Sequence, residues 1–337
     1  MIQEAIRKLV ENHPLSHDEA YTTLREIMSG DTTPAQIASF ITALRIRGET
    51  PDVIAGSVQA MREKFTAIQT PTDNVVDTCG TGGDGTNTFN ISTAAAFVAA
   101  GAGITVAKHG NKSVSSRSGS ADVLQALGVN IKVSADVMTH CLQEIQMAFL
   151  FAPSLHPAMK HAIGPRKEVG IRTIFNILGP LSNPAGAQYG VLGVYDRELV
   201  VTMGKAASDL GAKHLFVVHG NDGLDEFTTT TTSLVAEVKE KDVTITEIDP
   251  ETFNIPKVQP EDLKGGSPED NADIIKDILL GKKGSPRDIV VLNAAAAIIA
   301  GGKAENFPQG IEQAAHSIDS GAGANKLDQL ISYTNKN

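Results

Sequence analysis

Apolar and polar positions follow one period over the first 70 residues and another period beyond them. In the first part, apolar residues recur every three or four positions, as on one face of an α-helix. One such stripe consists of Ile37, Phe40, Ile41 and Leu44. Ser16 with Glu19 and Thr33 with Gln36 form capping boxes, which mark helix starts. With a further start at Thr50, the pattern predicts a small domain of four helices over residues 1–70.

From residue 75 onward, short β-branched runs alternate with segments of helical period. The predicted strands cover residues 75–76, 104–107, 149–152, 189–194, 215–218, 234–238 and 243–248. Predicted helices run from 92 or 93 to about 102 and over 122–127, and a further helix begins at a cap at Ser134. This alternation is typical of an α/β domain with a mainly parallel central sheet, which we expect over residues 75–337. The segment of about residues 156–180 is helical without a strand, so we expect it to join the N-terminal helices.

Composition and charge exclude several classes of protein. The 337 residues are 41% hydrophobic and 20% charged, which excludes a disordered chain and agrees with two globular domains. The net charge of −10, from 29 basic and 39 acidic residues, disfavours a nucleic-acid partner, because such binding needs a basic surface. A local positive pocket for a small anion remains compatible with that charge.

Cysteine use and the N-terminus indicate the compartment. Two cysteines, Cys79 and Cys141, exclude a disulfide framework and favour a reducing environment. The charged N-terminal segment does not resemble a secretory signal. The longest uncharged apolar run, residues 94–107, is shorter than the roughly 20 residues that a membrane span needs. We therefore expect a cytoplasmic protein without a membrane partner.

The segment 77–93 has the composition of a phosphate-binding loop. Glycines at 80, 82, 83 and 85 follow a predicted strand, polar donors follow the glycines, and a helix then begins. The N-terminus of a helix behind such a loop offers unpaired N–H groups and the positive end of the helix dipole to an anion. An ordinary glycine turn is the alternative. The loop has neither the Walker pattern nor a complete dinucleotide fingerprint.

A second polar loop, residues 108–120, follows the strand predicted at 104–107 and holds three cations and five serines. A solvated surface loop would have the same composition. However, both loops follow strands, and ligands of open α/β sheets bind at the carboxyl ends of the strands. Two donor-rich loops at one sheet edge indicate a ligand with two anionic groups, such as a monophosphate and a diphosphate.

Two further segments carry candidate ligands. Asp225 and Glu226 follow another predicted strand, and carboxylates opposite a phosphate site suit Mg²⁺, although adjacent acids are also common on solvated surfaces. Arg166 follows Gly164 and Pro165, so we expect it to begin a helix, from which a guanidinium can bind a carboxylate through two hydrogen bonds. Spacing alone favours a surface ion pair for this arginine.

Several kinds of catalytic centre have no support in the sequence. It contains no HExxH, CxxC or GxSxG motif. Cys79 has no evident histidine partner and is interpreted as a small buried residue. His109 is compatible with an acid–base role and equally with a hydrogen-bonding role in its loop.

Taken together, these motifs resemble those of a known enzyme family. Gly80-Thr-Gly-Gly-Asp84, Asn90-Ile-Ser-Thr93, Lys108-His-Gly-Asn111, Arg166, Asn176-Ile-Leu-Gly-Pro-Leu-Ser-Asn-Pro184 and Gly223-Leu-Asp-Glu226 closely resemble the anthranilate phosphoribosyltransferases of tryptophan biosynthesis, over essentially the whole chain. The resemblance implies a fold related to the pyrimidine nucleoside phosphorylases, a homodimer formed through the helical domain, Mg²⁺ as two ions, and 5-phosphoribosyl 1-diphosphate (PRPP) as substrate.

The resemblance also implies the site residues. PRPP would be bound by Gly80, Gly83, Asp84, Thr88, Asn90, Ile91, Ser92, Thr93, Lys108, His109, Gly110, Asn111, Lys112, Ser113, Val114, Ser115, Ser116 and Ser120. Anthranilate would contact Gly80, Asn111 and Arg166, and the metal would be bound by Ser92, Asp225 and Glu226. No residue is assigned as general acid or base. Two departures are Lys112, where members often have arginine, and the long threonine run 228–232.

The implied reaction transfers the 5-phosphoribosyl group of PRPP to the amine of anthranilate, giving N-(5-phosphoribosyl)anthranilate and diphosphate. One alternative is a pyrimidine nucleoside phosphorylase-like enzyme, against which stand Arg166 and a glycine loop unlike the Lys-His-Ser-Thr-Gly-Gly form. Another is a non-catalytic paralogue that binds nucleic acid, against which stand the net charge of −10 and the acid pair.

Overall fold

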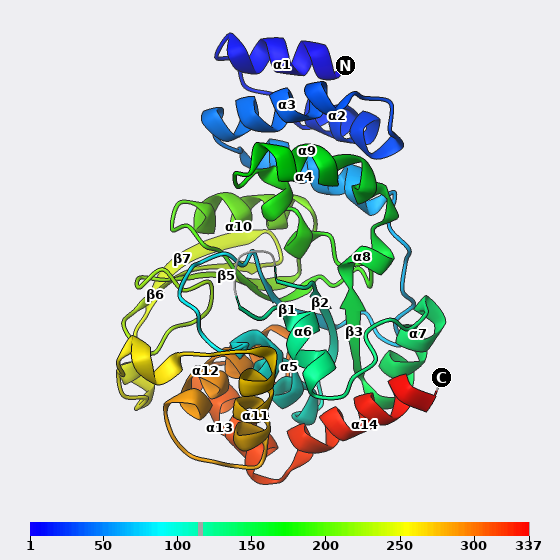
Figure 1. Ribbon diagram of the computed structural model, residues 1–337. Helices are drawn as coiled ribbons and strands as arrows, with labels where there is room; N and C mark the ends of the chain where they lie inside the picture. Colours follow the sequence, from blue (N-terminus) through cyan, green and yellow to red (C-terminus); the bar gives the residue numbers. More distant parts are fainter. Residues whose placement is uncertain (114–116, 337) are drawn as a thin grey trace.

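A computed structural model describes residues 1–113 and 117–336 of the chain. Its N-terminal helices stack above a sheet-based body (Figure 1). They are α1 (Ile2–Val10), α2 (His17–Ser29), α3 (Pro34–Arg47) and α4 (Pro51–Arg62). Both predicted capping boxes are present, at Ser16 and Thr33, and the Thr50 side chain caps α4. The predicted starts are confirmed because each cap satisfies an N–H that the helix leaves unpaired.

The body contains one seven-stranded sheet with the order β3-β2-β1-β4-β5-β6-β7. Its strands are β1 (Val75–Gly80), β2 (Thr105–Gly110), β3 (Met147–Phe151), β4 (Tyr189–Gly193), β5 (His214–Gly220), β6 (Ser233–Lys239) and β7 (Asp242–Ile248). The five strands from β3 to β5 are parallel, whereas β6 and β7 are antiparallel additions. The predicted fold class, a helical domain with a larger, mainly parallel α/β domain, is confirmed.

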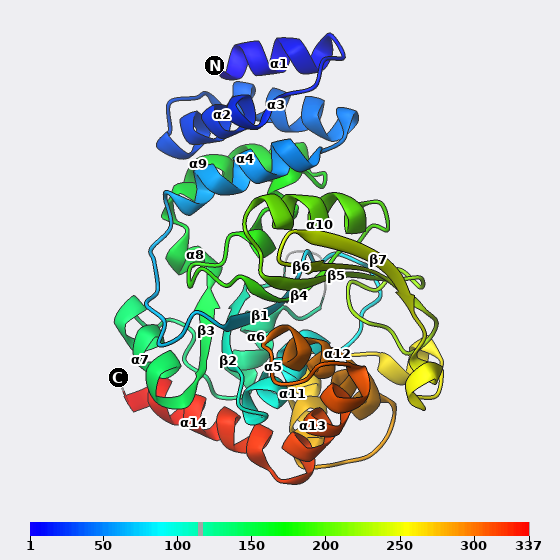
Figure 2. The ribbon, with the colours of Figure 1, turned by 180° about the vertical axis from the view of Figure 1, so that it is seen from behind.

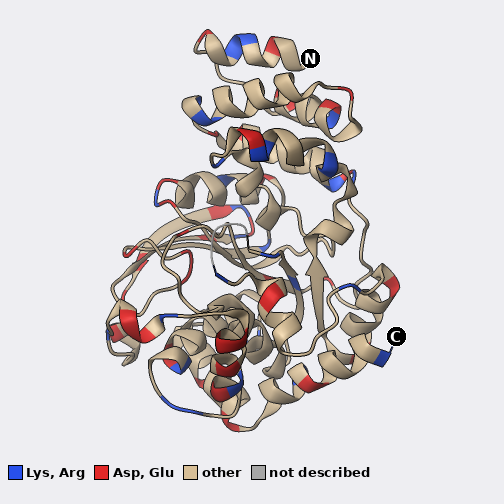
Figure 3. Cartoon of the chain, viewed as in Figure 1, with Lys and Arg blue, Asp and Glu red and all other residues tan. Residues whose placement is uncertain are grey.

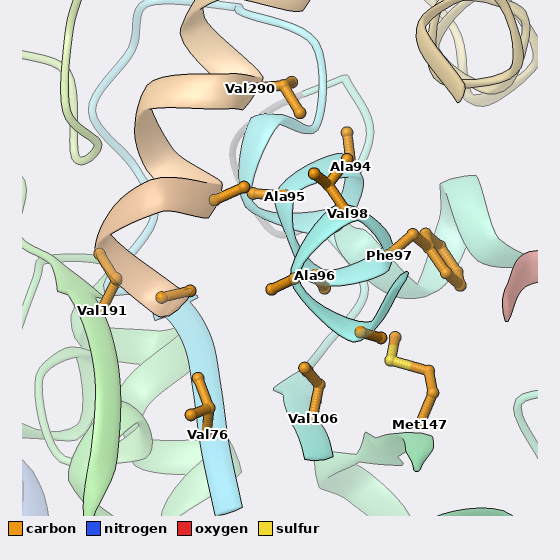
Figure 4. Packing of buried hydrophobic residues seen from close by; sticks show 14 of the residues in the cluster. Val76, Ala94, Ala95, Ala96, Phe97, Val98, Val106, Met147, Val191 and Val290 are labelled. Carbon is orange, nitrogen blue, oxygen red and sulfur yellow. The ribbon is translucent and has the colours of Figure 1, made fainter. Parts of the chain in front are cut away.

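Neighbouring strand residues face two different cores, as the period of two in a β-strand requires. Val191, Phe216, Val218 and Val235 face a core built around α5 (Ile91–Gly101) and α12 (Ser285–Ala300). Leu192, Val217, Ala236 and Val238 face a second core that contains α10 (Leu199–Asp209) and the N-terminal helices. Figure 4 shows α5 beside α12, with Ala95 between the two helices and Phe97 on the opposite side of α5. Val76, Val106 and Val191 of the sheet lie nearby. Small alanine side chains let the two helices approach closely.

The helical part and the sheet are joined by α10 and by the segment that follows β3. α10 packs on β5 and β6 and also contacts α4 (Figure 2). The segment after β3 forms α8 (Ala152–Leu155), a 3-10 turn (Pro157–Met159), α9 (Lys160–Val169) and two further 3-10 turns (Ile174–Asn176 and Gly179–Leu181). α9 packs against α2 and α3.

One local prediction in this segment is wrong. The sequence predicts that Arg166 begins a helix, but α9 already begins at Lys160 and Arg166 lies in its last turn. Pro165 lies inside the helix although its missing N–H removes a backbone hydrogen bond and its ring crowds the preceding turn. The packing of α9 on α2 and α3 must offset this cost. The helix ends at Gly170, which has a φ of 69°.

The remaining helices lie around the α5 core and complete the chain. They are α6 (Ser120–Ala126), α7 (Ala135–Ile145), α11 (Pro268–Leu279), α13 (Phe307–Asp319) and α14 (Ala322–Lys336), with 3-10 turns at Pro250–Phe253 and Pro260–Leu263. Acidic positions gather on α11 (Figure 3). Among the described residues, no helix is both long and apolar enough to cross a membrane.

Gly56 determines how closely α2 and α4 pack. A Cβ atom at this position would lie 2.2 Å from the carbonyl oxygen of His17. We expect Gly56→Ala to lower the free energy of unfolding by about 1–3 kcal/mol, because the two helices would have to separate. Urea denaturation measures this change.

Gln59→Ala provides the matched control, because Gln59 lies on the exposed face of the same helix, α4. Alanine there should change the free energy of unfolding by less than about 0.5 kcal/mol. Equal effects of the two substitutions would contradict the packing argument.

Candidate active site

Four neighbouring parallel strands, β1, β2, β4 and β5, each end in a glycine. From β1 the chain continues to β2 and β3, toward one edge of the sheet, and from β4 it continues to β5, toward the other edge. In open α/β sheets, ligands bind in the crevice at the carboxyl ends of the strands where the strand order reverses in this way. The loops after these four strands carry most of the predicted site residues.

Asp225 packs closely against the ends of β1 and β4. A Cβ at Gly80 would lie 2.4 Å from its Oδ2, and a Cβ at Gly193 would lie 1.5 Å from its carbonyl oxygen, so both positions require glycine. The N–H of Gly82 donates to Oδ2 of Asp225 at 2.7 Å. The predicted glycine loop and the predicted acid pair, 143 residues apart in the chain, are therefore in direct contact.

Glu226 contacts the start of α5. The N–H of Ser92, in the first turn of α5, donates to Oε1 of Glu226 at 3.1 Å. The residue before this helix, Asn90, forms no side-chain cap. The positive end of the helix dipole thus points toward the acid pair and the glycine loop. The predicted start of this helix at residue 92 or 93 is one or two residues late.

Lys108 is buried next to the start of α5, with only 1% of its surface exposed. Its ammonium donates to the carbonyl oxygen of Thr78, and to Oγ of Ser92 at 3.3 Å. Burial lowers the pKa of Lys108, while the carboxylates of Asp77 and Glu226 act in the opposite direction. A buried lysine whose pKa is shifted by burial and by nearby carboxylates is typical of a functional site.

The half-buried acid pair carries more negative charge than Lys108 balances. Burial raises the pKa of Asp225, and the nearby Asp84 adds to the rise. Burial and repulsion by Asp225 likewise raise the pKa of Glu226. Adjacent carboxylates with raised pKa values are stabilised in the charged form by a cation.

The loop after β2 is shaped by hydrogen bonds to Asp122. Its Oδ2 accepts the N–H groups of Ser113 at 2.9 Å and Gly119 at 3.0 Å. Lys112 lies 4.0 Å from the other carboxylate oxygen, so the cation at this position contacts an acid in the first turn of α6. The predicted PRPP contacts Val114, Ser115 and Ser116 lie outside the described residues.

Asn90 joins the two predicted phosphate loops. Its side-chain amide donates to the carbonyl oxygen of Ser118 at 3.1 Å, and its Oδ1 accepts from Nδ2 of Asn271 at 3.0 Å. Asn111 faces the same region from the β2 loop, where its carbonyl oxygen accepts from the Ala121 N–H at 3.1 Å. The PRPP candidates described by the structure therefore belong to two loops that are linked to each other.

A buried polar network supports β1 and β2. Asp77 accepts the N–H of His109 at 3.0 Å and the side-chain amide of Asn183 at 2.7 Å. His109 and His156 share a hydrogen bond between their Nε2 atoms at 3.1 Å. Burial lowers the pKa of His109 to about 3, with His156 adding to the effect, and burial lowers the pKa of His156 to about 4. Both rings are neutral at pH 7.

Arg166 lies in the last turn of α9. Its half-buried guanidinium lies over the ring of Phe175, 5.4 Å from the centroid, and burial lowers its pKa. In the part of the chain that the structure describes, no hydrogen bond joins it to Gly80 or Asn111. The three predicted anthranilate contacts are therefore not brought into direct contact with one another.

Sequence reasoning missed three residues of this region. Asp77 begins the glycine segment, and its signal is an acid in an otherwise apolar strand. Asn293 of α12 binds the main-chain N–H of Phe227 at 3.0 Å and its carbonyl oxygen at 2.8 Å, directly after the acid pair. Arg172 stacks on Tyr195, 4.1 Å from the ring centroid. No local pattern marks Asn293 or Arg172.

The threonine run 228–232 is a loop before β6, and its hydroxyls bind acids. Thr228 Oγ1 donates to Asp222 at 2.7 Å, and Thr232 donates to Glu247. These bonds anchor the loop that carries Asp225 and Glu226. The unusual run is therefore structural support next to the acid pair.

A magnesium ion fits the chemistry of the acid pair. Asp225 and Glu226 each use one carboxylate oxygen on a main-chain N–H, and the Ser92 hydroxyl lies nearby. Within the described residues, no group of three or more His, Cys, Asp or Glu side chains is placed to hold a metal ion. Mg²⁺ commonly uses one or two carboxylates and takes its other ligands from substrate phosphates and water, so this set suits it.

Comparison with known proteins identifies the family. Residues 3–65 match the model of the glycosyl transferase family helical bundle domain, and residues 72–324 match that of its a/b domain. The chain is 53% identical to the anthranilate phosphoribosyltransferase of Acetivibrio thermocellus, over 99% of this chain and 97% of that protein. The chain belongs to the anthranilate phosphoribosyltransferase family. The resemblance stated from the motifs is confirmed.

Solved structures of the family have the same fold. The enzyme from Thermus thermophilus superposes with a TM-score of 0.93 at 39% identity, covering 98% of this chain and 99% of that one. The Saccharomyces cerevisiae enzyme in complex with PRPP and Mg gives a TM-score of 0.91 at 30% identity, covering 100% and 98%. The yeast enzyme has also been solved with 4-fluoroanthranilate.

The buried histidine pair makes stability depend on pH. The pKa of His156 is about 6.5 in the unfolded chain and about 4 in the folded protein. Between these pH values the unfolded state therefore binds more protons than the folded state. Stability from the neutral ring is therefore present above pH 6.5 and is lost as the pH falls. Relative to His156→Gln, we expect the wild type to lose about 2 kcal/mol more between pH 7 and pH 4.5 in urea denaturation.

Glutamine at 156 keeps a hydrogen-bonding side chain but does not titrate, which makes it the matched comparison. Parallel stability curves for the two proteins over this pH range would show that folding does not change the pKa of His156, and would contradict the prediction.

Proposed function

We propose that this chain transfers the 5-phosphoribosyl group of PRPP to the amine of anthranilate, producing N-(5-phosphoribosyl)anthranilate and diphosphate. One observation carries the proposal: the acid pair touches the glycine loop and the start of α5, next to a buried lysine. This combination suits a magnesium diphosphate. Full-length similarity to anthranilate phosphoribosyltransferases, including one solved with PRPP and Mg, favours this reaction over the nucleoside phosphorylase and nucleic-acid-binding alternatives.

Two loops provide the phosphate contacts in this proposal. The N–H groups of the glycine loop and of the first turn of α5 are donors for the diphosphate. Residues 108–113, at the end of β2 and just beyond it, and Ser120 add cations and hydroxyls. Because Asn90 links both loops, binding at one loop is coupled to the position of the other.

Ser92, Asp225 and Glu226 would hold Mg²⁺, and we propose two ions. When bound, Mg²⁺ would neutralise the diphosphate and stabilise the charge it gains on departure. The chain's own contribution is to fix both carboxylates through main-chain N–H groups. Fixed carboxylates need little reorganisation during the reaction.

The reaction needs no covalent intermediate with the protein. The bond between C1 of the ribose and the diphosphate oxygen breaks, and its electron pair leaves with diphosphate. The lone pair of the anthranilate nitrogen forms the new bond to C1, and the nitrogen then releases a proton to solvent. An aniline nitrogen is already unprotonated near neutral pH, so we assign no general base. The protein's task is alignment and charge stabilisation.

Arg166, Asn111 and Gly80 would contact anthranilate. The carboxylate of anthranilate is ortho to its amine, so a guanidinium that binds the carboxylate also fixes the direction of the amine. Arg166 is held in place by Phe175 from the segment between the two cores. The yeast structure with 4-fluoroanthranilate supports a site for such a ring in this family.

We also propose a cytoplasmic homodimer that contacts its partner through the helical domain, residues 1–70 with the segment of about 156–180. Support comes from apolar side chains exposed on this part of the described chain. They are Met1, Val10, Ile46, Ile163 and Ile171. The α/β domain, residues 75–337, would then remain accessible to substrates.

The function is tested by incubating the protein with PRPP, Mg²⁺ and anthranilate and following the loss of anthranilate fluorescence. We expect turnover by the wild type, and no turnover by Asp225→Asn/Glu226→Gln at ordinary Mg²⁺ concentrations. Two acids beside a diphosphate would repel it without a cation, so removing their charges removes the metal site. Raised Mg²⁺ should recover part of the activity.

Asp249→Asn/Glu251→Gln is the matched control, because these two acids lie on the surface beside Lys257. It should retain wild-type activity. Full activity in the Asp225/Glu226 variant would overturn the metal assignment, whereas an inactive wild type would overturn the proposed reaction.

Arg166→Ala should impair the use of anthranilate with little change for PRPP. A charge-assisted hydrogen bond contributes roughly 1.5–3 kcal/mol, so kcat/KM for anthranilate should fall about ten- to a hundredfold. Lysine should recover only part, since it lacks the planar fork of donors. Steady-state kinetics with each substrate varied separately provides the measurement.

Lys167→Ala, at the neighbouring exposed position of α9, should leave both kinetic constants unchanged. A weaker interaction of Arg166→Ala with PRPP, together with unchanged use of anthranilate, would show that the two substrates have been assigned to the wrong parts of the cleft.

A further inference from the structure

Arg172 lies in the short connection between α9 and the 3-10 turn that begins at Ile174. Its guanidinium carbon is 4.1 Å from the centroid of the Tyr195 ring, which follows the end of β4. Tyr195 is fixed in turn, because its N–H donates to Oγ1 of Thr81 at 3.0 Å. Stacking therefore holds the guanidinium beside the first residues of the glycine loop.

The guanidinium also lies against the middle of that loop. A Cβ at Gly83 would lie 3.1 Å from Nη2 of Arg172 and 3.4 Å from Cζ. Gly83 has a φ of 74°, so glycine is favoured here both by the backbone and by the approach of the arginine. The charge of Arg172 also reaches Asp225, where it opposes the rise in pKa caused by burial.

The nitrogen atoms of Arg172 remain available to a ligand. Among residues 1–113 and 117–336, no salt bridge engages this side chain, which is exposed. A guanidinium stacked by its face on an aromatic ring keeps its five N–H donors, which lie in its plane and point outward. Donors of this kind, beside a phosphate loop and close to an acid pair that suits Mg²⁺, match the oxygens of a diphosphate.

We propose that Arg172 binds the diphosphate group of PRPP, with Tyr195 as the platform that orients it. The inference rests on the proposed function and adds a residue to its leaving-group site. Positive charge at this point would stabilise the negative charge that the departing diphosphate gains. Arg172 would thus act on PRPP, whereas Arg166, six residues earlier on the same segment, acts on the carboxylate of the acceptor.

The test compares Arg172→Ala and Arg172→Lys with the wild type. Isothermal titration calorimetry, without anthranilate, measures binding of PRPP with Mg²⁺ and of inorganic diphosphate with Mg²⁺. Loss of one charge-assisted contact should weaken both ligands about ten- to a hundredfold in Arg172→Ala. Lysine should recover part of this loss. In steady-state kinetics, KM for PRPP should rise, while KM for anthranilate should stay within about twofold.

Arg25→Ala is the matched control, because Arg25 also stacks on a tyrosine, Tyr21, 5.5 Å from the ring centroid, but does so in the helical part. Its affinity for PRPP should equal that of the wild type. Tyr195→Leu removes the platform but keeps the charge, so it should weaken diphosphate binding less than Arg172→Ala does. This second variant also provides the test if Arg172→Ala does not fold.

Three outcomes separate the possibilities. Wild-type affinity for PRPP and diphosphate in Arg172→Ala, with or without a lower melting temperature, would overturn the proposal and leave a purely structural role. A raised KM for anthranilate alone would also overturn it, because the arginine would then serve the acceptor. Failure of the wild type to bind PRPP would instead contradict the proposed function.

Discussion

The contact of Asp225 with the ends of β1 and β4 is the constraint on which the site depends. Its main-chain oxygen occupies the space that a Cβ at Gly193 would need, and its carboxylate occupies that of a Cβ at Gly80. Only glycine at both strand ends lets the loop after β5 fold back this far. This approach places Glu226 at the start of α5 and joins the acid pair to the glycine loop.

Electrostatics then explains why the assembled site suits a magnesium diphosphate. Asp77, Asp225 and Glu226 all act electrostatically on one buried ammonium, that of Lys108, and burial raises the pKa of each acid. Charges removed from water cost free energy unless they are paired, and here the acids outnumber the buried cation. A divalent cation corrects this imbalance, and a diphosphate in turn requires that cation. The excess of buried acids and the negative charge of the diphosphate are each unfavourable alone, and a divalent cation between them compensates both.

Patterns that are local in sequence predict the fold well, and contacts distant in sequence account for the errors. Capping at Ser16 and Thr33 needs only residues three positions apart, so both helix starts are predictable. The predicted position of Arg166 is wrong because the packing of α9 on α2 and α3 extends the helix upstream through Pro165, which overrides the local signal of Gly164-Pro165. Arg172 and Asn293 act through partners that are distant in the chain, Tyr195 and Phe227, and no spacing rule reveals such pairs.

The segment between β3 and β4 connects the helical part to the proposed site. Through α9 it packs on α2 and α3, and its last 3-10 turn accepts two hydrogen bonds from Arg62 of α4 at the carbonyl oxygen of Leu181. The same segment carries Arg166, Arg172 and His156, which hydrogen-bonds His109 on β2. A shift of the helical part relative to the sheet would therefore move both arginines relative to the acid pair on the β5 loop. In the proposed site, alignment of the donor and acceptor substrates would thus depend on how the helical part packs on the sheet, because the two arginines come from the segment between β3 and β4 and the acid pair comes from the β5 loop.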